Sequence, residues 1–128
     1  MYFLGIDAGA SATKWALISE NRLVTSGTQE AMDGHLYRET SKVRMNEVLK
    51  EIAHQIGGKS ISRVYLGITG VIHDGSIEEL LQQTFNAPSI VVSDIELAYR
   101  ANFSEGDGIL VYAGTGSVAY AIDEKGVV

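Results

Sequence analysis

Hydrophobic residues near the start of the chain fall into three short runs, at residues 2–6, 14–18 and 22–28. Small or polar residues separate the runs, and short apolar runs joined by turn-forming residues are typical of strands in β-hairpins. The pattern therefore predicts that the chain opens with an antiparallel meander of three strands.

The spacing of the hydrophobic residues then changes. Over residues 40–56, and again over residues 77–85, apolar residues recur at steps of three and four, which predicts two amphipathic helices. A pair of glycines follows the first helix and is expected to end it. Ser76, with Glu79 three positions later, predicts a capping box at the start of the second helix.

Further apolar runs alternate with these helices. Residues 63–69 and 89–93 are expected to form strands, and the second run is almost wholly apolar, which predicts burial on both of its faces. A short helix is expected to start at Asp94, and a last pair of strands is expected at residues 109–113 and 118–122. An antiparallel start followed by alternating strands and helices predicts an α/β fold in which helices flank a mixed sheet.

Length and composition exclude several classes of protein. The chain has 128 residues without an internal linker or repeat, so residues 1–128 are expected to form a single domain. A net charge of −6 with no cluster of Lys and Arg argues against a nucleic-acid partner. No cysteine is present, which rules out disulfides, thiol catalysis and cysteine metal sites. No apolar run reaches the ~20 residues of a membrane span, and the N-terminus lacks the features of a signal peptide, so we expect a cytoplasmic protein without a membrane partner.

The first candidate site is the turn between the first two predicted strands, which follows Asp7 and leads into Lys14. Its six residues are all small, so that backbone N–H groups can approach an anion closely. Ser11 and Thr13 add hydroxyl donors, Lys14 adds a positive charge, and Asp7 could hold Mg²⁺ through water. These residue types indicate a phosphate site, and an ordinary hairpin turn is the alternative.

A second turn of the same chemistry lies between the last two predicted strands. It consists of Gly114, Thr115, Gly116 and Ser117, which combine a bare backbone with two hydroxyl groups. A turn without a ligand is again the alternative. Two such turns in one small protein favour a site that holds a di- or triphosphate from two sides.

Asp94 is the third candidate, because it directly follows a strand that is predicted to be buried. The carboxyl end of such a strand is where α/β sheets place their ligands. Asp94 could therefore accept the proton of an attacking hydroxyl in a phosphoryl transfer. The alternative is that Asp94 caps the next helix, which aspartate commonly does, and one residue can serve both purposes.

Together these stretches resemble the N-acetylglucosamine kinase and BadF/BadG/BcrA/BcrD ATPase family of the sugar kinase/actin-like ATPase superfamily. The matching residues are 4–14, 65–70, 91–94 and 111–120, in the order that the family has them. The resemblance implies a ribonuclease-H-like domain with a mixed sheet flanked by helices. It also implies that the protein binds ATP with Mg²⁺, for which Asp7 is the expected metal-binding residue.

The resemblance further implies roles for individual residues. The ATP phosphates are expected at two groups of residues, of which the first is Gly9, Ala10, Ser11, Thr13 and Lys14 and the second is Gly114, Thr115, Gly116 and Ser117. The substrate is expected at Asp33, Gly34, His35, Gly70 and Asp94, with Asp94 also the catalytic residue. The chain lacks an Asn that the family often has in the 33–35 loop, which leaves the identity of the sugar open. Its first turn reads Gly-Ala-Ser where many members have Gly-Gly-Thr, and Ser11 keeps the hydroxyl group.

Enzymes of this type have two like domains with ATP between them, so this chain resembles the N-terminal half, without the second domain. The implied function is transfer of the γ-phosphoryl group of ATP to a hydroxyl of an amino sugar such as N-acetylglucosamine or glucosamine. We expect a homodimer, and no kinase activity from these residues alone. One alternative is an ATPase that activates 2-hydroxyacyl-CoA dehydratases, which the lack of cysteine disfavours. The other is a nucleotide-binding module without turnover, which the presence of Asp7 and Asp94 disfavours.

Overall fold

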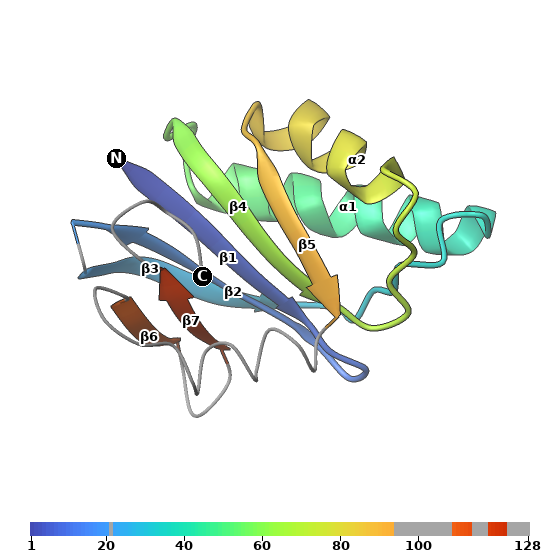
Figure 1. Ribbon diagram of the computed structural model, residues 1–128, viewed down its shortest axis with the longest axis horizontal. Coiled ribbons are helices and arrows are strands. Elements are labelled where there is room, and N and C mark those ends of the chain that lie inside the picture. Colours follow the sequence, from blue (N-terminus) through green and yellow to red (C-terminus); the bar gives the residue numbers. More distant parts are fainter. Residues whose placement is uncertain (21, 94–108, 114–117, 123–128) are drawn as a thin grey trace.

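The computed structural model describes residues 1–20, 22–93, 109–113 and 118–122 of the chain. Five strands form a mixed sheet in the order β3-β2-β1-β4-β5, in which β1 to β3 are an antiparallel meander and β4 and β5 run parallel to β1 (Figure 1). The predicted meander and fold class are thereby confirmed. The strands are β1 (Tyr2–Ala8), β2 (Thr13–Ser19), β3 (Arg22–Gln29), β4 (Ile61–Ile68) and β5 (Ser89–Ser93).

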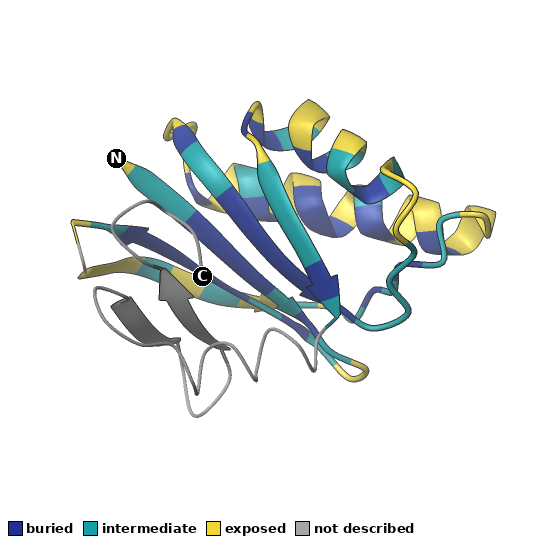
Figure 2. Cartoon of the chain, in the orientation of Figure 1, coloured by how far each residue is buried: buried dark blue, intermediate teal, exposed yellow. Residues whose placement is uncertain are grey.

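Two helices, α1 (Glu39–Gln55) and α2 (Ser76–Phe85), cover one face of this sheet (Figure 1). The buried residues of both helices, nearly all apolar, lie on the inner side, as Figure 2 shows. Met45, Ile52 and Leu81 have no exposed surface and belong to the core between helices and sheet. Both predicted helices are confirmed, and no helix in the described part of the chain is long and apolar enough to span a membrane.

Side chains along β1 alternate between the two faces of the sheet. Leu4, Ile6 and Ala8 belong to the core under the helices. Because successive side chains of a strand point to opposite faces, Gly5 and Asp7 lie on the face that the helices leave uncovered. This alternation decides on which side of the sheet each candidate site residue lies.

The face away from the helices is also apolar near its centre. Ile18, Tyr65 and Val92 are buried there, and none of them belongs to the core under the helices. The last two predicted strands are present as β6 (Ile109–Ala113) and β7 (Val118–Ile122). They pair antiparallel with each other and contact β1, β2 and β3. Among the described strands, β6 and β7 form a separate two-stranded sheet and do not extend the five-stranded one.

Two local predictions are wrong. The N-cap of α2 is Gly75, in the left-handed conformation with φ 87°, and the amide of Ser76 donates a hydrogen bond of 2.9 Å to Asp74 Oδ1, so this carboxylate replaces the predicted capping box. β5 is the last strand of the five-stranded sheet, and apart from Val92 its residues are half-buried and not buried on both faces. The helix predicted from Asp94 lies outside the described residues.

Candidate functional site

The predicted site residues that the structure describes gather at the edge where the parallel strands β1 and β4 end. The last residues of these strands, Ala8 and Ile68, are paired, and the amide of Thr69 then donates a hydrogen bond of 3.1 Å to the carbonyl of Ala8. The carbonyl of Thr69 accepts a hydrogen bond of 3.0 Å from the amide of Gly34. These bonds place the segments after β1, β3 and β4 side by side at the carboxyl edge, where α/β sheets bind ligands.

The turn after β1 is shorter than the sequence predicts. Ala8 and Thr13 still pair as the last residues of β1 and β2, so the connection has only the residues 9–12. The amide of Gly9 donates to the carbonyl of Ala12 at 3.1 Å, which uses this N–H inside the turn. Ala10 and Ser11 are exposed at the tip, so their amides and the Ser11 hydroxyl are the groups of the turn that an anion can reach.

Asp7 and Lys14 lie opposite each other on β1 and β2. Directly opposed residues of an antiparallel pair project from the same face of the sheet. Since the neighbouring Ile6 and Ala8 face the helices, Asp7 and Lys14 lie on the other face, and both are half-buried. A carboxylate and an ammonium group therefore flank the turn on one side of the sheet.

Thr13 lies on the opposite side of the sheet from Asp7 and Lys14. It is paired with Ala8, on the face that α1 and α2 cover, and it has no exposed surface. Its hydroxyl is buried and has no hydrogen-bond partner within the part of the chain that the structure describes. Of the predicted phosphate ligands in this turn, Thr13 is thus set apart, and its role stays a prediction.

Asp33, Gly34, His35 and Gly70 form a compact cluster at the same edge. The amide of His35 donates a hydrogen bond of 2.9 Å to Asp33 Oδ1, and Nδ1 of the His35 ring lies 3.4 Å from the same oxygen. A Cβ atom on Gly34 would lie 2.6 Å from the carbonyl oxygen of Gly70, so the two loops approach each other more closely than any side chain would allow. The structure therefore brings together four residues that the sequence only grouped by resemblance.

The environment of Asp33 keeps its carboxyl group ionised. Burial alone would raise its pKa, but the hydrogen bond from the His35 amide, a hydrogen bond from Ser41 and the positive charges of His35 and Arg38 together lower the pKa below its usual value of 3.8. At neutral pH this loop therefore presents a negative charge at the carboxyl edge.

The other candidates, Asp94 and the turn of residues 114–117, lie outside the described residues. Described strands adjoin both segments in the sequence. β5 ends at Ser93, which is paired with Ile68 of β4, and the 114–117 turn connects β6 with β7. β5 therefore ends at the same carboxyl edge, and the role of Asp94, the next residue in the sequence, stays a prediction.

A magnesium ion at this edge is compatible with the residues present. The described residues contain no group of three or more His, Cys, Asp or Glu that could enclose a metal ion. Mg²⁺ does not require such a cage, because it keeps several waters and is commonly held by one or two carboxylates together with phosphate oxygens. Asp7, half-buried beside the turn, fits the part of that single carboxylate.

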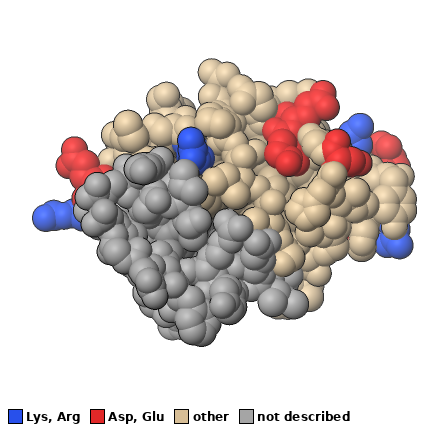
Figure 3. Space-filling model, viewed as in Figure 1, with Lys and Arg blue, Asp and Glu red and all other residues tan. Residues whose placement is uncertain are grey.

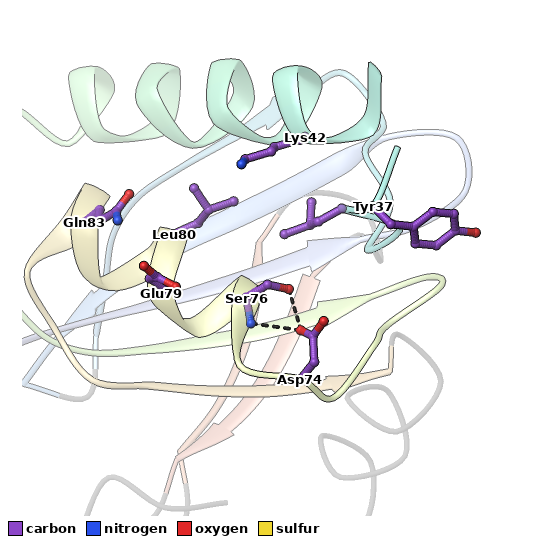
Figure 4. Close-up of a pocket in the computed structure, with 8 residues that line it drawn as sticks. Tyr37, Lys42, Asp74, Ser76, Glu79, Leu80 and Gln83 are labelled. Atoms are coloured by element: carbon purple, nitrogen blue, oxygen red, sulfur yellow. Dashed lines mark hydrogen bonds between the residues drawn. The ribbon is translucent and has the colours of Figure 1, made fainter. Parts of the chain in front are cut away.

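A separate groove of about 320 Å³ lies between α1 and α2, on the helix side of the sheet (Figure 4). Figure 3 shows acidic side chains gathered where the helices lie. In Figure 4 the Tyr37 ring points away from the groove, which contains no residue predicted from the sequence to bind phosphate or sugar. The residues that line it are Leu36, Tyr37, Lys42, Asp74, Ser76, Glu79, Leu80 and Gln83.

The chain matches proteins of known family along nearly its whole length. The model of the BadF/BadG/BcrA/BcrD ATPase family matches residues 4–128. An N-acetylmuramic acid/N-acetylglucosamine kinase of Clostridium acetobutylicum is 27% identical over an alignment of 135 residues. This alignment covers 98% of this chain and 44% of the relative. The chain thus spans less than half the length of this curated relative.

A solved structure has the same fold. The putative N-acetylglucosamine kinase from Porphyromonas gingivalis superimposes with a TM-score of 0.69 at 20% sequence identity, over 83% of this chain and 39% of that one. A likeness at this level of identity shows the fold, which agrees with the predicted mixed sheet flanked by helices.

Proposed function

The chain belongs to the BadF/BadG/BcrA/BcrD ATPase family, and we propose that it is the N-terminal part of an ATP-dependent kinase that phosphorylates an amino sugar. The observation that carries this proposal is the convergence of two loops at one carboxyl edge of the sheet. The turn flanked by Asp7 and Lys14 has the chemistry for phosphate, and the cluster of Asp33, His35 and Gly70 has polar groups for a sugar.

The turn after β1 would hold the phosphates of ATP. The amides of Ala10 and Ser11 and the Ser11 hydroxyl donate hydrogen bonds at its exposed tip, and the Lys14 ammonium group adds charge from the same side of the sheet as Asp7. Asp7 would hold a hydrated Mg²⁺, which neutralises charge on the phosphate oxygens when it is bound. In this proposal Gly9 contributes by having no side chain, because its amide already bonds to Ala12.

Phosphoryl transfer depends mainly on positioning and on electrostatic stabilisation. We propose that Asp94 is the general base that accepts the proton of the attacking sugar hydroxyl. Asp94 is the residue after β5, and β5 ends at the edge of the sheet that also carries the 33–35 loop. The turn of residues 114–117 is proposed to hold the phosphates from a second side. Thr13, buried beneath the turn, would support the strand pair and not contact the nucleotide directly.

The proposed substrate is an amino sugar such as N-acetylglucosamine or glucosamine. The name of the clostridial relative adds N-acetylmuramic acid to the sugars that deserve testing. An ATPase that activates another enzyme remains the second candidate within the family. It differs in one respect that can be measured, since it would release free phosphate and no sugar phosphate.

The assignment of Asp94 is tested by Asp94→Asn in the two-domain enzyme. We expect Mg-ATP to bind with unchanged affinity and the turnover number to fall by a factor of ~10²–10⁴, as is typical when a general base is lost. Titration calorimetry measures the first quantity and a coupled ADP assay the second. Turnover at the wild-type rate would leave Asp94 as a helix cap only.

A further inference from the structure

The ring of His35 is confined by three neighbours at the carboxyl edge. Asp33 Oδ1 lies 3.4 Å from Nδ1, and the Tyr37 ring centroid lies 5.7 Å from that of His35, with the rings tilted by 58°. On the third side is Gly70, where a Cβ atom would lie 2.7 Å from Cε1 and 2.8 Å from Nε2 of the ring. The ring is held in this position and is still about one third exposed, with 35% of its side-chain surface accessible.

Two observations favour glycine at position 70. Its φ of 69° is in the left-handed region that side chains disfavour, and a Cβ there would lie within 3 Å of the imidazole as it is placed, so that the ring would have to move. Gly34 imposes a similar restriction from the other loop, because its own Cβ would strike the Gly70 carbonyl. The two bare residues therefore let the 33–35 loop and the turn after β4 pack directly against each other around the ring.

The position of Asp33 favours a proton on the nearer ring nitrogen, because Nδ1 lies 3.4 Å from the Asp33 carboxylate oxygen. A lone pair on Nδ1 would face a carboxylate oxygen, whereas a proton there is attracted to it. The carboxylate is charged at neutral pH, since its pKa lies below the usual value of 3.8. In the neutral ring this charge favours Nδ1 as the N–H and Nε2 as the acceptor.

We infer that Asp33 is a positioning residue that holds His35 with its proton on Nδ1, so that Nε2 accepts a hydrogen bond from a hydroxyl or amide N–H of the sugar. This inference rests on the proposed function for the identity of the ligand. The preference for a proton on Nδ1 and the contact of the ring with Gly70 are argued from the geometry of the cluster alone. His35 is thus the residue that contacts the sugar, and Asp33 acts through it.

The tautomer is tested by long-range ¹H–¹⁵N NMR of the imidazoles in this chain. The chain has three histidines, of which His54 and His73 are exposed and serve as internal references. For the neutral ring of His35 we expect a pyrrole-type shift at Nδ1 and a pyridine-type shift at Nε2, the reverse of the common tautomer. In Asp33→Asn, the common tautomer with the proton on Nε2 should predominate at His35.

Asp74→Asn is a matched control for this variant. Asp74, like Asp33, accepts a hydrogen bond of 2.9 Å from the amide two residues further along the chain, but it lies before α2. The Asp74→Asn variant should leave the His35 spectrum unchanged. A His35 ring that shows the common tautomer in the unaltered chain, or the same tautomer in Asp33→Asn, would overturn the inference.

The consequence for the sugar is tested in the two-domain kinase. We expect Asp33→Asn to raise the KM for the sugar by about tenfold, the effect of about one hydrogen bond, with little change in kcat or in the KM for ATP. The Asp74→Asn variant should leave all three constants unchanged. An unaltered sugar KM in Asp33→Asn, in an enzyme that does phosphorylate sugars, overturns the inference and leaves the proposed function standing. If the unaltered enzyme phosphorylates no sugar, the proposed function fails, and the claim about a sugar ligand fails with it.

Discussion

Glycines in this chain are needed for different physical reasons. Gly70 combines a left-handed backbone with a close contact to the His35 ring, which a Cβ would displace. Gly27 needs only space, because a Cβ there would strike the Trp15 ring at 2.7 Å. Gly9 has neither a left-handed backbone nor a close neighbour, since a Cβ there would lie at an ordinary distance of 3.7 Å from the Ala12 carbonyl oxygen. Packing among the described residues therefore does not require glycine at position 9, and we propose that a bound phosphate does.

Gly9→Ala separates these two explanations. We expect the free energy of unfolding to change by no more than about 0.5 kcal/mol, because the new methyl group has room. The affinity for Mg-ATP should fall by about tenfold, since the methyl group keeps the phosphates away from the turn. Chemical denaturation measures the first effect and titration calorimetry the second. Unchanged affinity would show that the turn does not bind phosphate through its bare backbone.

Asp33 predicts a pH dependence of stability whose sign follows from its pKa. The pKa of Asp33 in the folded chain lies below the usual value of 3.8, so the ionised group stabilises the fold above that pH. This contribution is lost as the pH falls through the lower pKa of the folded state. Asp33→Asn should therefore lose less stability than the unaltered chain between about pH 5 and about pH 3. Equal losses of unfolding free energy in the two proteins, measured by urea denaturation, would contradict a lowered pKa at Asp33.

Among the elements, the pairing of β2 with β3 depends on one close contact. Trp15 and Gly27 are directly opposed in this pair, and the indole ring, which is 1% exposed, covers the position where a side chain of residue 27 would stand. Three ring atoms would lie within 2.8 Å of a Cβ at Gly27. A buried ring of this size has little freedom to move away, because protein interiors are close-packed.

Gly27→Ala is expected to destabilise the chain by about 1–3 kcal/mol, the usual cost of overpacking a core. Without the indole contact the same change in a strand would be favourable or neutral, since glycine is the poorer strand former. Gly9→Ala is the matched control, because it adds the same methyl group where there is room. Denaturation curves in urea provide the comparison. A loss below about 0.5 kcal/mol in Gly27→Ala would contradict the geometry of this pair.

Local patterns predicted the elements well, and contacts between distant segments were harder to predict. The predictions of α1 and α2 are confirmed because each of these helices buries an apolar face whose period can be counted along the chain. The N-cap of α2 was wrong because Ser76 and Asp74 both suit a helix start, and only the backbone of Gly75 decides between them. The edge position of β5 was missed because an apolar run does not show whether a further strand pairs beside it.

In the candidate site, too, local features could be predicted from the sequence and contacts between distant segments could not. The turn after β1 could be found from its residue types, although its length was overestimated and the burial of Thr13 was missed, because the strand alternation continues through this residue. The grouping of Asp33 and His35 with Gly70 came from a resemblance and not from spacing. Their contact depends on two loops that meet only in the folded chain.

At the scale of the whole molecule, the chain provides one side of the proposed site. The first predicted phosphate turn (residues 9–12) and the predicted sugar loop (residues 33–35) lie at one edge of the sheet, and the chain spans 44% of the clostridial kinase. Phosphoryl transfer between two substrates requires that both be positioned and that water be excluded, which closure around the substrates provides. We therefore expect this chain alone to bind Mg-ATP weakly and to transfer no phosphate. The homodimer expected from the sequence stays a prediction, for which Leu23 and Val24, more than 40% exposed on the edge strand β3, are the surface to examine.

The central claim is that this chain is part of a sugar kinase. Its most direct test is the fate of the γ-phosphoryl group when the two-domain protein is incubated with γ-labelled Mg-ATP and N-acetylglucosamine, glucosamine or N-acetylmuramic acid. We predict labelled sugar phosphate formed in equal amount with ADP, and at least about 100-fold less of it from Asp94→Asn in the same time. Release of the label as free phosphate at a rate that no sugar changes would contradict the assignment as a sugar kinase and favour an ATPase of the same family.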